Sequence, residues 1–184
     1  HDGLAYVENN EQYGFIDLVG NEVIQLDCDS VSSFQEGTAY ISSNGKYGYI
    51  DQQGEVIIDL IYDDATYFTD GLAKVRVGGQ VGVIDKSGRE IIPIIYEAVD
   101  FINGMILTKS NNTYGYFDNE GLVILPQEYE GIYDPDNGYL QYKYNNQWGL
   151  ADMQGNIILK QDYESIDTHP ELDLIVVKQG EKSG

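Results

Sequence analysis

The chain contains few of the residues that catalytic and cross-linking chemistry most often uses. Its 184 residues include one cysteine, Cys28, so no internal disulfide can form, and two histidines, His1 and His169. Neither histidine shares a motif with a serine or another nucleophile, so no nucleophilic triad can be assembled, and the pair does not indicate a metal site. No Gly-rich phosphate loop opens a helix. These absences argue against an enzyme, and we expect no cofactor.

Basic residues are also scarce, because 10 Lys and Arg stand against 31 Asp and Glu and leave a net charge of −21. A field of that sign repels phosphate backbones and anionic membrane surfaces, so we expect no nucleic-acid partner. The chain has no run of 18 apolar residues, and we expect no membrane insertion. No signal peptide is visible. Cations, basic proteins and neutral polymers such as glycans remain as partner classes.

The chain does contain a repeated motif, aromatic–Gly–x–x–Asp–x–x–Gly, with valine in place of the aromatic residue in the third copy. The five copies are Tyr13-Gly14…Asp17…Gly20, Tyr47-Gly48…Asp51…Gly54, Val81-Gly82…Asp85…Gly88, Tyr114-Gly115…Asp118…Gly121 and Trp148-Gly149…Asp152…Gly155. Their first glycines are 34, 34, 33 and 34 residues apart. Such a period indicates a tandem repeat whose units stack on one another.

We therefore expect a single repeat array. Its predicted units are residues 1–34, which start in mid-repeat, then 35–68, 69–101, 102–135 and 136–169, with a partial sixth unit at 170–184. Because both ends fall inside a repeat, we interpret the chain as a piece of a longer array. The pattern allows either an open superhelix or propeller-like stacking, and the cut ends favour an open or spiral array.

Period-two alternation predicts strands within each unit. In the third copy Ala73, Val75 and Val77 are expected to face inward and to alternate with Leu72, Lys74 and Arg76. The same alternation places Ala5 and Val7, Ala39 and Ile41, Leu140 and Tyr142, and Ile175 and Val177 inward. A hairpin at Gly78-Gly79 leads into the aromatic–Gly strand, Asp-x-x-Gly closes a turn, and an apolar strand returns. Each unit is thus predicted to be an antiparallel meander of about three strands followed by a loop, in an all-β fold with little helix.

At these residues the chain resembles the WG-repeat, or KWG-repeat, family of bacterial proteins. The resemblance rests on Lys46-Tyr47-Gly48-Tyr49-Ile50-Asp51, Gln147-Trp148-Gly149-Leu150, Ile91-Ile92-Pro93 and Tyr62-Asp63, and it covers nearly the whole chain. Tryptophan occurs once, and tyrosine or valine replaces it in the other copies. The resemblance implies an all-β repeat, mostly without an assigned activity and often in exported or surface proteins. It therefore implies an extracellular or cell-surface location in a bacterium.

Two columns of acids recur. The Asp-x-x-Gly acids are expected to cap their own turns, with a row of cation-binding carboxylates as the alternative. The second column follows a tyrosine in all but the first copy and consists of Asp29, Asp63, Glu97, Glu130 and Glu164. These acids either bind Ca²⁺ or a basic partner, or they are exposed or bonded to the backbone, which we favour.

One loop resembles the beginning of a calcium site. In Asp134-Pro135-Asp136-Asn137-Gly138, oxygen ligands occur close together before a glycine, which makes Asp134, Asp136 and Asn137 weak Ca²⁺ candidates. The loop lacks the downstream glutamate of an EF-hand, and an ordinary turn explains it equally well.

The candidate partner surface lies on outward positions of the first predicted strand. Tyr6, Tyr40 and Tyr139 are aromatic platforms for a glycan or protein, although exposed tyrosines also simply cover a sheet. Positions Tyr6, Tyr40, Lys74, Leu107 and Gln141 differ among copies and define the variable face. Cys28 replaces a tyrosine and is expected to be a buried filler.

The favoured function is a non-catalytic binding or adhesion module that presents an extended acidic, tyrosine-rich surface to a protein or glycan partner, since repeats multiply weak contacts. The alternative is a passive spacer or stalk without a ligand. An enzyme is the third hypothesis, and it is disfavoured because every recurring acid occurs in every copy, whereas catalysis needs one special pair.

Overall fold

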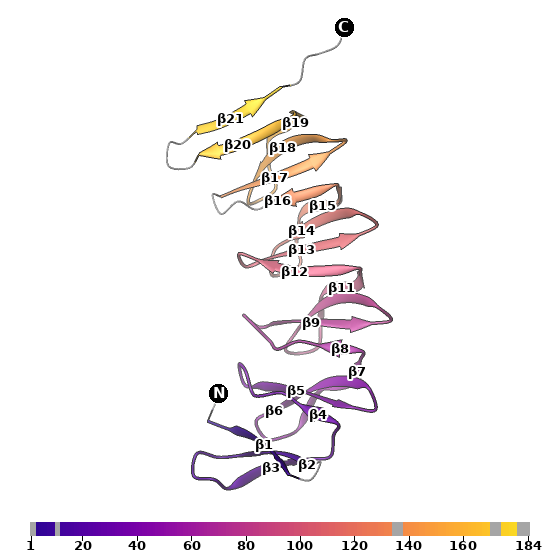
Figure 1. Cartoon of the computed structure of the whole chain (residues 1–184), viewed down its shortest axis with the longest axis vertical. Coiled ribbons are helices and arrows are strands. Elements are labelled where there is room, and N and C mark those ends of the chain that lie inside the picture. The colour runs from indigo at the N-terminus through magenta and orange to yellow at the C-terminus, as the bar shows by residue number, and fades with distance from the viewer. Residues whose placement is uncertain (1–2, 10–11, 134–137, 170–173, 180–184) are drawn as a thin grey trace. The chain divides into compact units, whose positions relative to one another are not determined.

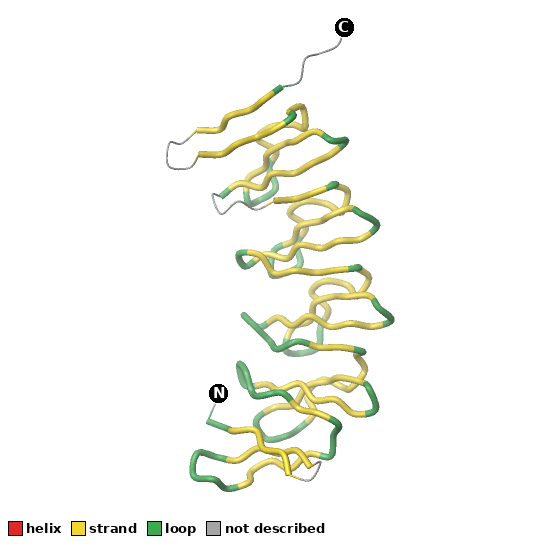
Figure 2. Tube along the Cα trace, in the orientation of Figure 1, coloured by secondary structure: helices red, strands yellow, loops and turns green. Residues whose placement is uncertain are grey.

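The computed structural model describes residues 3–9, 12–133, 138–169 and 174–179 (Figures 1 and 2). Every regular secondary-structure element within these ranges is a β-strand. The prediction of an all-β repeat is confirmed. Contacts group the chain into two compact units, 1–96 and 97–184.

The first unit contains three antiparallel sheets. One sheet has three strands, β1 (Ala5–Asn9), β2 (Gln12–Ile16) and β3 (Glu22–Leu26). The next has four, β4 (Ser30–Val31), β5 (Thr38–Ser43), β6 (Lys46–Asp51) and β7 (Val56–Tyr62). The third also has four, β8 (Asp64–Ala65), β9 (Leu72–Val77), β10 (Gln80–Asp85) and β11 (Glu90–Tyr96).

The second unit repeats this plan. Its four-stranded sheets are β12 (Ala98–Ile102), β13 (Met105–Ser110), β14 (Thr113–Phe117) and β15 (Val123–Tyr129), then β16 (Gly131–Tyr133), β17 (Tyr139–Tyr144), β18 (Gln147–Asp152) and β19 (Ile157–Tyr163). A two-stranded sheet follows, formed by β20 (Ser165–His169) and β21 (Leu174–Lys178).

Strands neighbour one another in chain order in every sheet, so each complete sheet is a four-stranded meander, the form of a propeller blade. The prediction of three strands and a loop missed one strand per unit. The segment after the tyrosine–acid step, expected to be a loop, contains the short first strand of the next sheet, as in β4 and β8.

The hairpin between the second and third strands is closed by two residues with positive φ. These pairs are Asn44-Gly45, Gly78-Gly79, Asn111-Asn112 and Asn145-Asn146, with φ between 50° and 84°. Positive φ at both central positions is the requirement of a type I′ turn, whose twist matches that of the flanking strands. The predicted hairpin at Gly78-Gly79 is therefore confirmed, and asparagine serves the same purpose elsewhere.

A bulge explains the glycine of the aromatic–Gly pair. Tyr47 pairs with Tyr62 and Tyr49 with Ile58, so β7 has two more residues than β6 between these pairs. The bulged backbone passes directly over Gly48, where a Cβ atom would lie 2.5 Å from the Ile58 carbonyl oxygen. No side chain fits at that distance, so the column requires glycine for steric reasons and not for its φ.

Buried clusters lie between consecutive sheets within each unit. Phe15 of β2 meets Phe34 at a ring-centroid distance of 4.6 Å, and Tyr49 of β6 meets Phe68 at 4.7 Å. In the second unit Tyr129 of β15 and Tyr142 of β17 lie 4.8 Å apart in the corresponding cluster. Each sheet inside a unit thus covers its neighbour, as stacked repeats require.

The inward prediction for the third copy is only partly correct. Ala73 and Val75 are buried, but Val77 is 40% exposed at the end of β9, and Leu72, expected to face outward, is buried. Ile175 and Val177 were also predicted to face inward, yet they are 38% and 40% exposed on β21.

The repeat that is one residue shorter has a different first strand. Asp70, the first positive-φ turn residue, lies five positions after Ala65, whereas Asn103 lies four positions after Val99. The shorter connection lets β12 continue as a regular hairpin into β13, with Ile102 paired to Met105. Phe101 consequently stays on the strand and is 40% exposed, whereas Phe34 and Phe68 are fully buried.

Candidate binding surface

The five Asp-x-x-Gly acids bind the backbone of their own turns. In each turn one carboxylate oxygen accepts hydrogen bonds from two backbone N–H groups, two and four residues further on. The glycine N–H, three residues on, donates to the carbonyl oxygen of the same aspartate at 2.9–3.1 Å. These hydrogen bonds confirm the interpretation of the acids as turn caps. They engage the carboxylates in stabilising their own turns.

Hydrogen bonding also lowers the pKa of several turn acids. The Ser87 hydroxyl, which donates to Asp85 at 2.6 Å, is the main reason that the pKa of Asp85 falls to about 2, with Arg89 contributing further. The pKa values of Asp17 and Asp152 are lowered by hydrogen bonds from the backbone and side chains of Asn21 and Asn156. These acids therefore carry full negative charge at neutral pH.

The acids that follow the tyrosine column cap hairpin tips of the sheet that they lead into. The Asn44 N–H donates to Asp29 at 2.7 Å, and the Gly78 N–H donates to Asp63 at 2.6 Å. Glu97 and Glu130 accept from the N–H groups of Asn111 and Asn146. Asp63 additionally pairs with Lys46 of the preceding sheet at 2.5 Å, and Glu164 pairs with Lys178 at 2.8 Å. The recurrence of this column thus has a backbone-capping explanation.

Glu36 is a further acid with a structural role, and the sequence patterns did not identify it. Its carboxylate accepts the N–H groups of Asp70 and Gly71 in the next sheet, at 2.8 and 3.1 Å, and lies 3.1 Å from Lys86. These bonds lower the pKa of Glu36 although partial burial opposes them. These contacts connect the second repeat to the third within the first unit.

The predicted variable face has two kinds of environment. Tyr6 is 40% exposed, and its hydroxyl donates to Glu8 at 2.8 Å, a bond that raises the pKa of Tyr6 to about 12. Tyr40 and Leu107, expected to point outward, are half-buried against the clusters between sheets, and the Tyr40 ring lies 5.0 Å from Tyr67. Alternation predicted their side of the strand correctly but could not show that another sheet covers it. Lys74, Gln141 and Tyr139 are also half-buried.

Three further exposed tyrosines lie outside the predicted face. Besides Tyr6, the exposed tyrosines among the described residues are Tyr67 (38%), Tyr133 (57%) and Tyr144 (37%). The sequence could have indicated their exposure, because two of them stand next to a buried residue of a repeated column. Tyr67 precedes buried Phe68, and Tyr133 follows buried Ile132. Ile132 and Tyr133 are adjacent on β16, and adjacent residues on a strand point to opposite faces, so Tyr133 points away from the core that contains Ile132.

Tyr133 forms part of an aromatic group with Trp148, the single tryptophan of the chain. The two ring centroids are 5.3 Å apart, and the Lys143 ammonium lies 5.7 Å from the centre of the Trp148 ring. A large exposed ring beside a half-buried one offers an apolar platform on an otherwise acidic surface.

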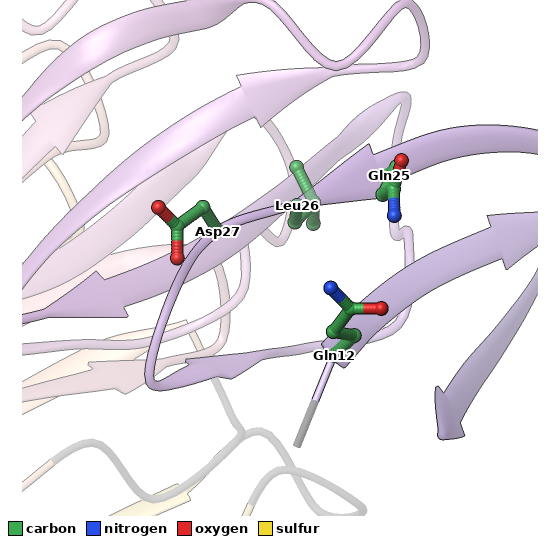
Figure 3. Close-up of a pocket in the computed structure, with 4 residues that line it drawn as sticks. All are labelled: Gln12, Gln25, Leu26 and Asp27. Atoms are coloured by element: carbon green, nitrogen blue, oxygen red, sulfur yellow. The ribbon is translucent and has the colours of Figure 1, made fainter. Parts of the chain in front are cut away.

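An open pocket of about 470 Å³ lies on the first unit, lined by Gln12, Gln25, Leu26 and Asp27 (Figure 3). Its lining offers two amides and one carboxylate but no acid–base pair or nucleophile. Cys28, expected to be buried, is half-buried, and its burial raises the pKa of its thiol.

The calcium candidates Asp134, Asp136 and Asn137 lie outside the described residues. Within the described ranges, no three His, Cys, Asp or Glu side chains come together as metal ligands would. Over the same ranges there is no helix long and apolar enough to cross a bilayer.

The sheets repeat along the chain, and the recurring acids bind turns, hairpin tips or a neighbouring lysine. These features define an all-β tandem-repeat module. The family model described as "WG containing repeat" matches residues 13–47, 47–80, 82–114, 114–148 and 148–182, so the chain belongs to the WG-repeat family. The resemblance seen in the sequence is thereby confirmed. Membership suggests a repeat module of the binding or scaffold class.

Comparison with other known proteins adds little about function. No curated protein matches the chain. Among solved structures, Kluyveromyces lactis Hsv2 is similar at 14% identity and a TM-score of 0.46, over 82% of this chain and 58% of that one. A eukaryotic initiation factor is similar at 13% and 0.49, over 85% and 50%. The WD40 β-propeller domain of Doa1 is similar at 12% and 0.32, over 97% and 72%. The chain spans only 58% of the length of Hsv2, and likeness at this level carries no functional inference.

Proposed function

We propose that the chain is a non-catalytic binding module that presents an acidic, tyrosine-bearing surface to a protein or glycan partner at a bacterial cell surface. The observation that carries the proposal is that the recurring side chains have structural roles, whereas the exposed side chains vary between repeats. Recurring carboxylates bind the turns, and the glycines of the aromatic–Gly motif lie too close to neighbouring atoms for a side chain. Phe34 and Phe68 belong to the packing between sheets. Exposed tyrosines such as Tyr67 and Tyr133, in contrast, stand at positions where the other repeats have different residues. Varied groups on a constant frame are typical of repeat proteins that bind partners.

The charge balance favours a partner that is cationic or neutral. Since 31 acids stand against 10 basic residues, most carboxylates cannot have an internal ion pair. Basic residues are in addition partly engaged, as Lys46, Lys86 and Arg89 pair with acids. Location at the surface of a bacterium is part of the proposal and is supported only by what the family resemblance implies.

The test is co-sedimentation of the purified chain with isolated bacterial cell-wall sacculi, at low and high salt and with and without Ca²⁺. We expect salt-resistant pelleting that Tyr133→Ala weakens at least threefold, because an exposed ring contributes through apolar contact that salt does not screen. Leu122→Ala is the matched control, since Leu122 is 66% exposed but aliphatic.

Other outcomes would redirect the proposal. Pelleting that requires Ca²⁺ would indicate a bridging cation between carboxylates of the two surfaces. Loss of pelleting at high salt would indicate a basic protein of the wall as the partner. Absence of pelleting under every condition would contradict wall binding and leave the passive spacer as the better account.

A further inference from the structure

We propose that the rings of Tyr133 and Trp148, on the sheet β16–β19, form a platform for a neutral glycan whose flat sugar rings stack on them. The proposal rests on the proposed function of a binding module, and it names the site and the class of ligand. Three features of this repeat support it. They are a tyrosine at a position with small or acidic residues elsewhere, a glycine beneath the tyrosine ring, and the absence of carboxylates beside the two rings.

Tyr133 occupies a position at which the other sheets have no aromatic residue. Pairing with the second strand shows that its equivalents are Ser32, Thr66, Asp100 and Asp167. Ser32 and Thr66 have a structural role, because their hydroxyls accept the backbone N–H groups of Tyr40 and Lys74, both at 3.0 Å. Tyr133 is instead 57% exposed, so its ring contributes to the surface.

The exposure of this position does not depend on the sheet that follows. Inside a unit, the first and second strands of one sheet contact the third and fourth strands of the sheet before it, as β16 and β17 contact β14 and β15. This packing lies over the third and fourth strands, whereas Tyr133 is on the first. Asp100, at the equivalent position of β12, is also exposed although the complete sheet β16–β19 follows it.

Gly131 makes room for the Tyr133 ring. Residues two apart on a strand share a face, so the ring can lie along β16 over the glycine. A Cβ at Gly131 would lie 3.0 Å from Cε2 of Tyr133, which is tighter than ordinary van der Waals contact. Gly131 is not among the glycines with positive φ, so the backbone does not require it. The equivalent residues in the other sheets all have a side chain, and they are Ser30, Asp64, Ala98 and Ser165.

The two rings form one continuous surface and not a groove. Their centroids are 5.3 Å apart and their planes are inclined by 53°. A proline ring held between two aromatic rings would need about 7 Å between them, because carbon atoms pack at about 3.5–4 Å. The pair therefore lacks the groove in which proline-rich peptides bind. A ligand must lie on the open ring faces, as the C–H face of a pyranose does.

The charges around the rings favour a neutral ligand. The residues in register beside them on this face are Gln141, Lys143 and Tyr163, and none is a carboxylate. The Lys143 ammonium, 5.7 Å from the centre of the Trp148 ring, repels a basic peptide, whereas the net charge of −21 repels an anionic polymer. A neutral glycan meets neither repulsion, and the Gln141 amide and the Lys143 ammonium can donate hydrogen bonds to its hydroxyl groups.

The single tryptophan provides the first measurement, because tryptophan emission reports on this site alone. The probes are chitohexaose and cellohexaose, two neutral β-linked oligosaccharides with flat ring faces. We expect a saturable change in emission with at least one of them, independent of NaCl, and a loss of affinity of about tenfold in Tyr133→Ala. Tyr144→Ala is the matched control, since Tyr144 is 37% exposed in the same sheet and adjoins Lys143 on the strand, which places it on the opposite face.

Gly131→Ala tests the arrangement of the rings without removing one. Alanine is compatible with this strand position, because Ala98 occupies it in β12, but its methyl group displaces the Tyr133 ring. We expect affinity to fall about threefold while Tm changes by less than about 2 °C. Adding Gly131→Ala to Tyr133→Ala should cause no further loss of affinity. An equal loss in both backgrounds would show that the glycine does not act through the tyrosine ring and would overturn the proposed platform.

The soluble probes separate this proposal from the proposed function. If the chain pellets with sacculi but responds to neither oligosaccharide, wall binding stands and the glycan platform is overturned. A response to decaproline alone, affinity that falls with salt, or equal losses in Tyr133→Ala and Tyr144→Ala would also overturn it. Saturable oligosaccharide binding that Tyr133→Ala weakens, without pelleting, would support the platform and contradict the cell wall as its target.

Discussion

At the scale of single residues, the glycine of the aromatic–Gly motif is the most constrained position. A Cβ at Gly82 would lie 2.6 Å from the Ile92 carbonyl oxygen and 2.8 Å from the Ile94 Cα. Backbone cannot move aside as a flexible side chain can, so even one methyl group displaces the bulge of β11. The motif was predictable from its recurrence, but its cause, a two-residue bulge in the neighbouring strand, was not, because bulges depend on strand pairing.

We expect Gly82→Val to destabilise the protein by more than about 3 kcal/mol, with Gly82→Ala costing somewhat less. Urea denaturation followed by circular dichroism would measure the loss. Gln80→Val is the control in the same strand, because Gln80 is exposed and its substitution should change stability by less than about 0.5 kcal/mol. A Gly82→Val protein with the urea midpoint of the parent would contradict the assignment of the bulge.

A second residue-scale feature is a pair that changes character between repeats. In β9 and β11, Val75 and Ile94 occupy two positions whose equivalents in β13 and β15 are Thr108 and Gln127. The Thr108 hydroxyl is fully buried and lies 2.5 Å from the Gln127 Oε1, while the Gln127 amide donates to the Thr113 carbonyl oxygen at 2.6 Å. The polar pair thus replaces an apolar one at the same place in the fold.

Removing one member of this pair should cost more than removing both. Thr108→Val leaves Gln127 without its partner, and Gln127→Leu leaves a buried hydroxyl with fewer partners, so each should cost about 1–3 kcal/mol. The double variant recreates the chemistry of Val75 and Ile94, so its cost should be smaller than the sum of the two. A double-mutant cycle in urea measures the coupling. Strict additivity would show that the two side chains do not act together.

At the scale of elements, the sequence predicted three of the four strands in a unit. Strands such as β9 and β10 are six residues long with clear alternation, so their pattern is readable. The missed strands β4 and β8 have only two residues each, and their partner β5 or β9 determines them through hydrogen bonding. Local sequence contains little information about such short strands, because tertiary pairing and not propensity decides them.

The same limit applies to the candidate surface. Tyr40 was correctly placed on the opposite side of the strand from Ala39 and Ile41, but the following sheet half-buries it. Tyr67, Tyr133 and Tyr144 were not singled out as surface residues, because exposure depends on which faces the neighbouring sheets cover. Phe101 shows how one residue fewer in a connection changes exposure without any change in residue type.

The hairpin turns allow a stabilising substitution. Asn112 has φ of 61° and Asn146 has φ of 60°, whereas Gly45 and Gly79 occupy the equivalent turn position elsewhere. Glycine adopts this conformation without the steric cost that asparagine has. We expect Asn112→Gly and Asn146→Gly each to raise the free energy of unfolding by a few tenths of a kcal/mol to about 1 kcal/mol. Thermal melting checks this, with exposed Gln154→Gly, outside these hairpins, as the control; a lowered melting temperature for both turn variants would contradict the turn type.

At the scale of the whole molecule, charge is the dominant feature. A net charge of −21 makes exposed carboxylates repel one another in the folded chain, and folding increases their density. Ion pairs at the surface oppose this effect only weakly, since exposed pairs contribute about 0–1 kcal/mol each. The destabilisation that repulsion among carboxylates causes should therefore exceed the stabilisation that ion pairs such as Lys46–Asp63 provide.

Salt should consequently stabilise this protein. Raising NaCl from about 0.02 M to about 0.5 M shortens the Debye length several-fold and should increase Tm by roughly 3 °C or more. Differential scanning calorimetry at neutral pH measures the change, and glycerol or sucrose at equal osmolality controls for effects unrelated to charge. A Tm that falls with salt would mean that attractive pairs outweigh repulsion.

The meander order of the sheets has a mechanical consequence. Because successive strands are neighbours, the first and last strands of a sheet such as β4–β7 lie at opposite edges, and tension along the chain pulls those edges apart. Hydrogen bonds between the strands then open one after another like a zipper, at a lower force than simultaneous shearing would need. Each repeat of about 34 residues would release roughly 115 Å of extended chain. Held between two anchored domains, such a chain would lengthen in small steps under load, as an extensible tether does.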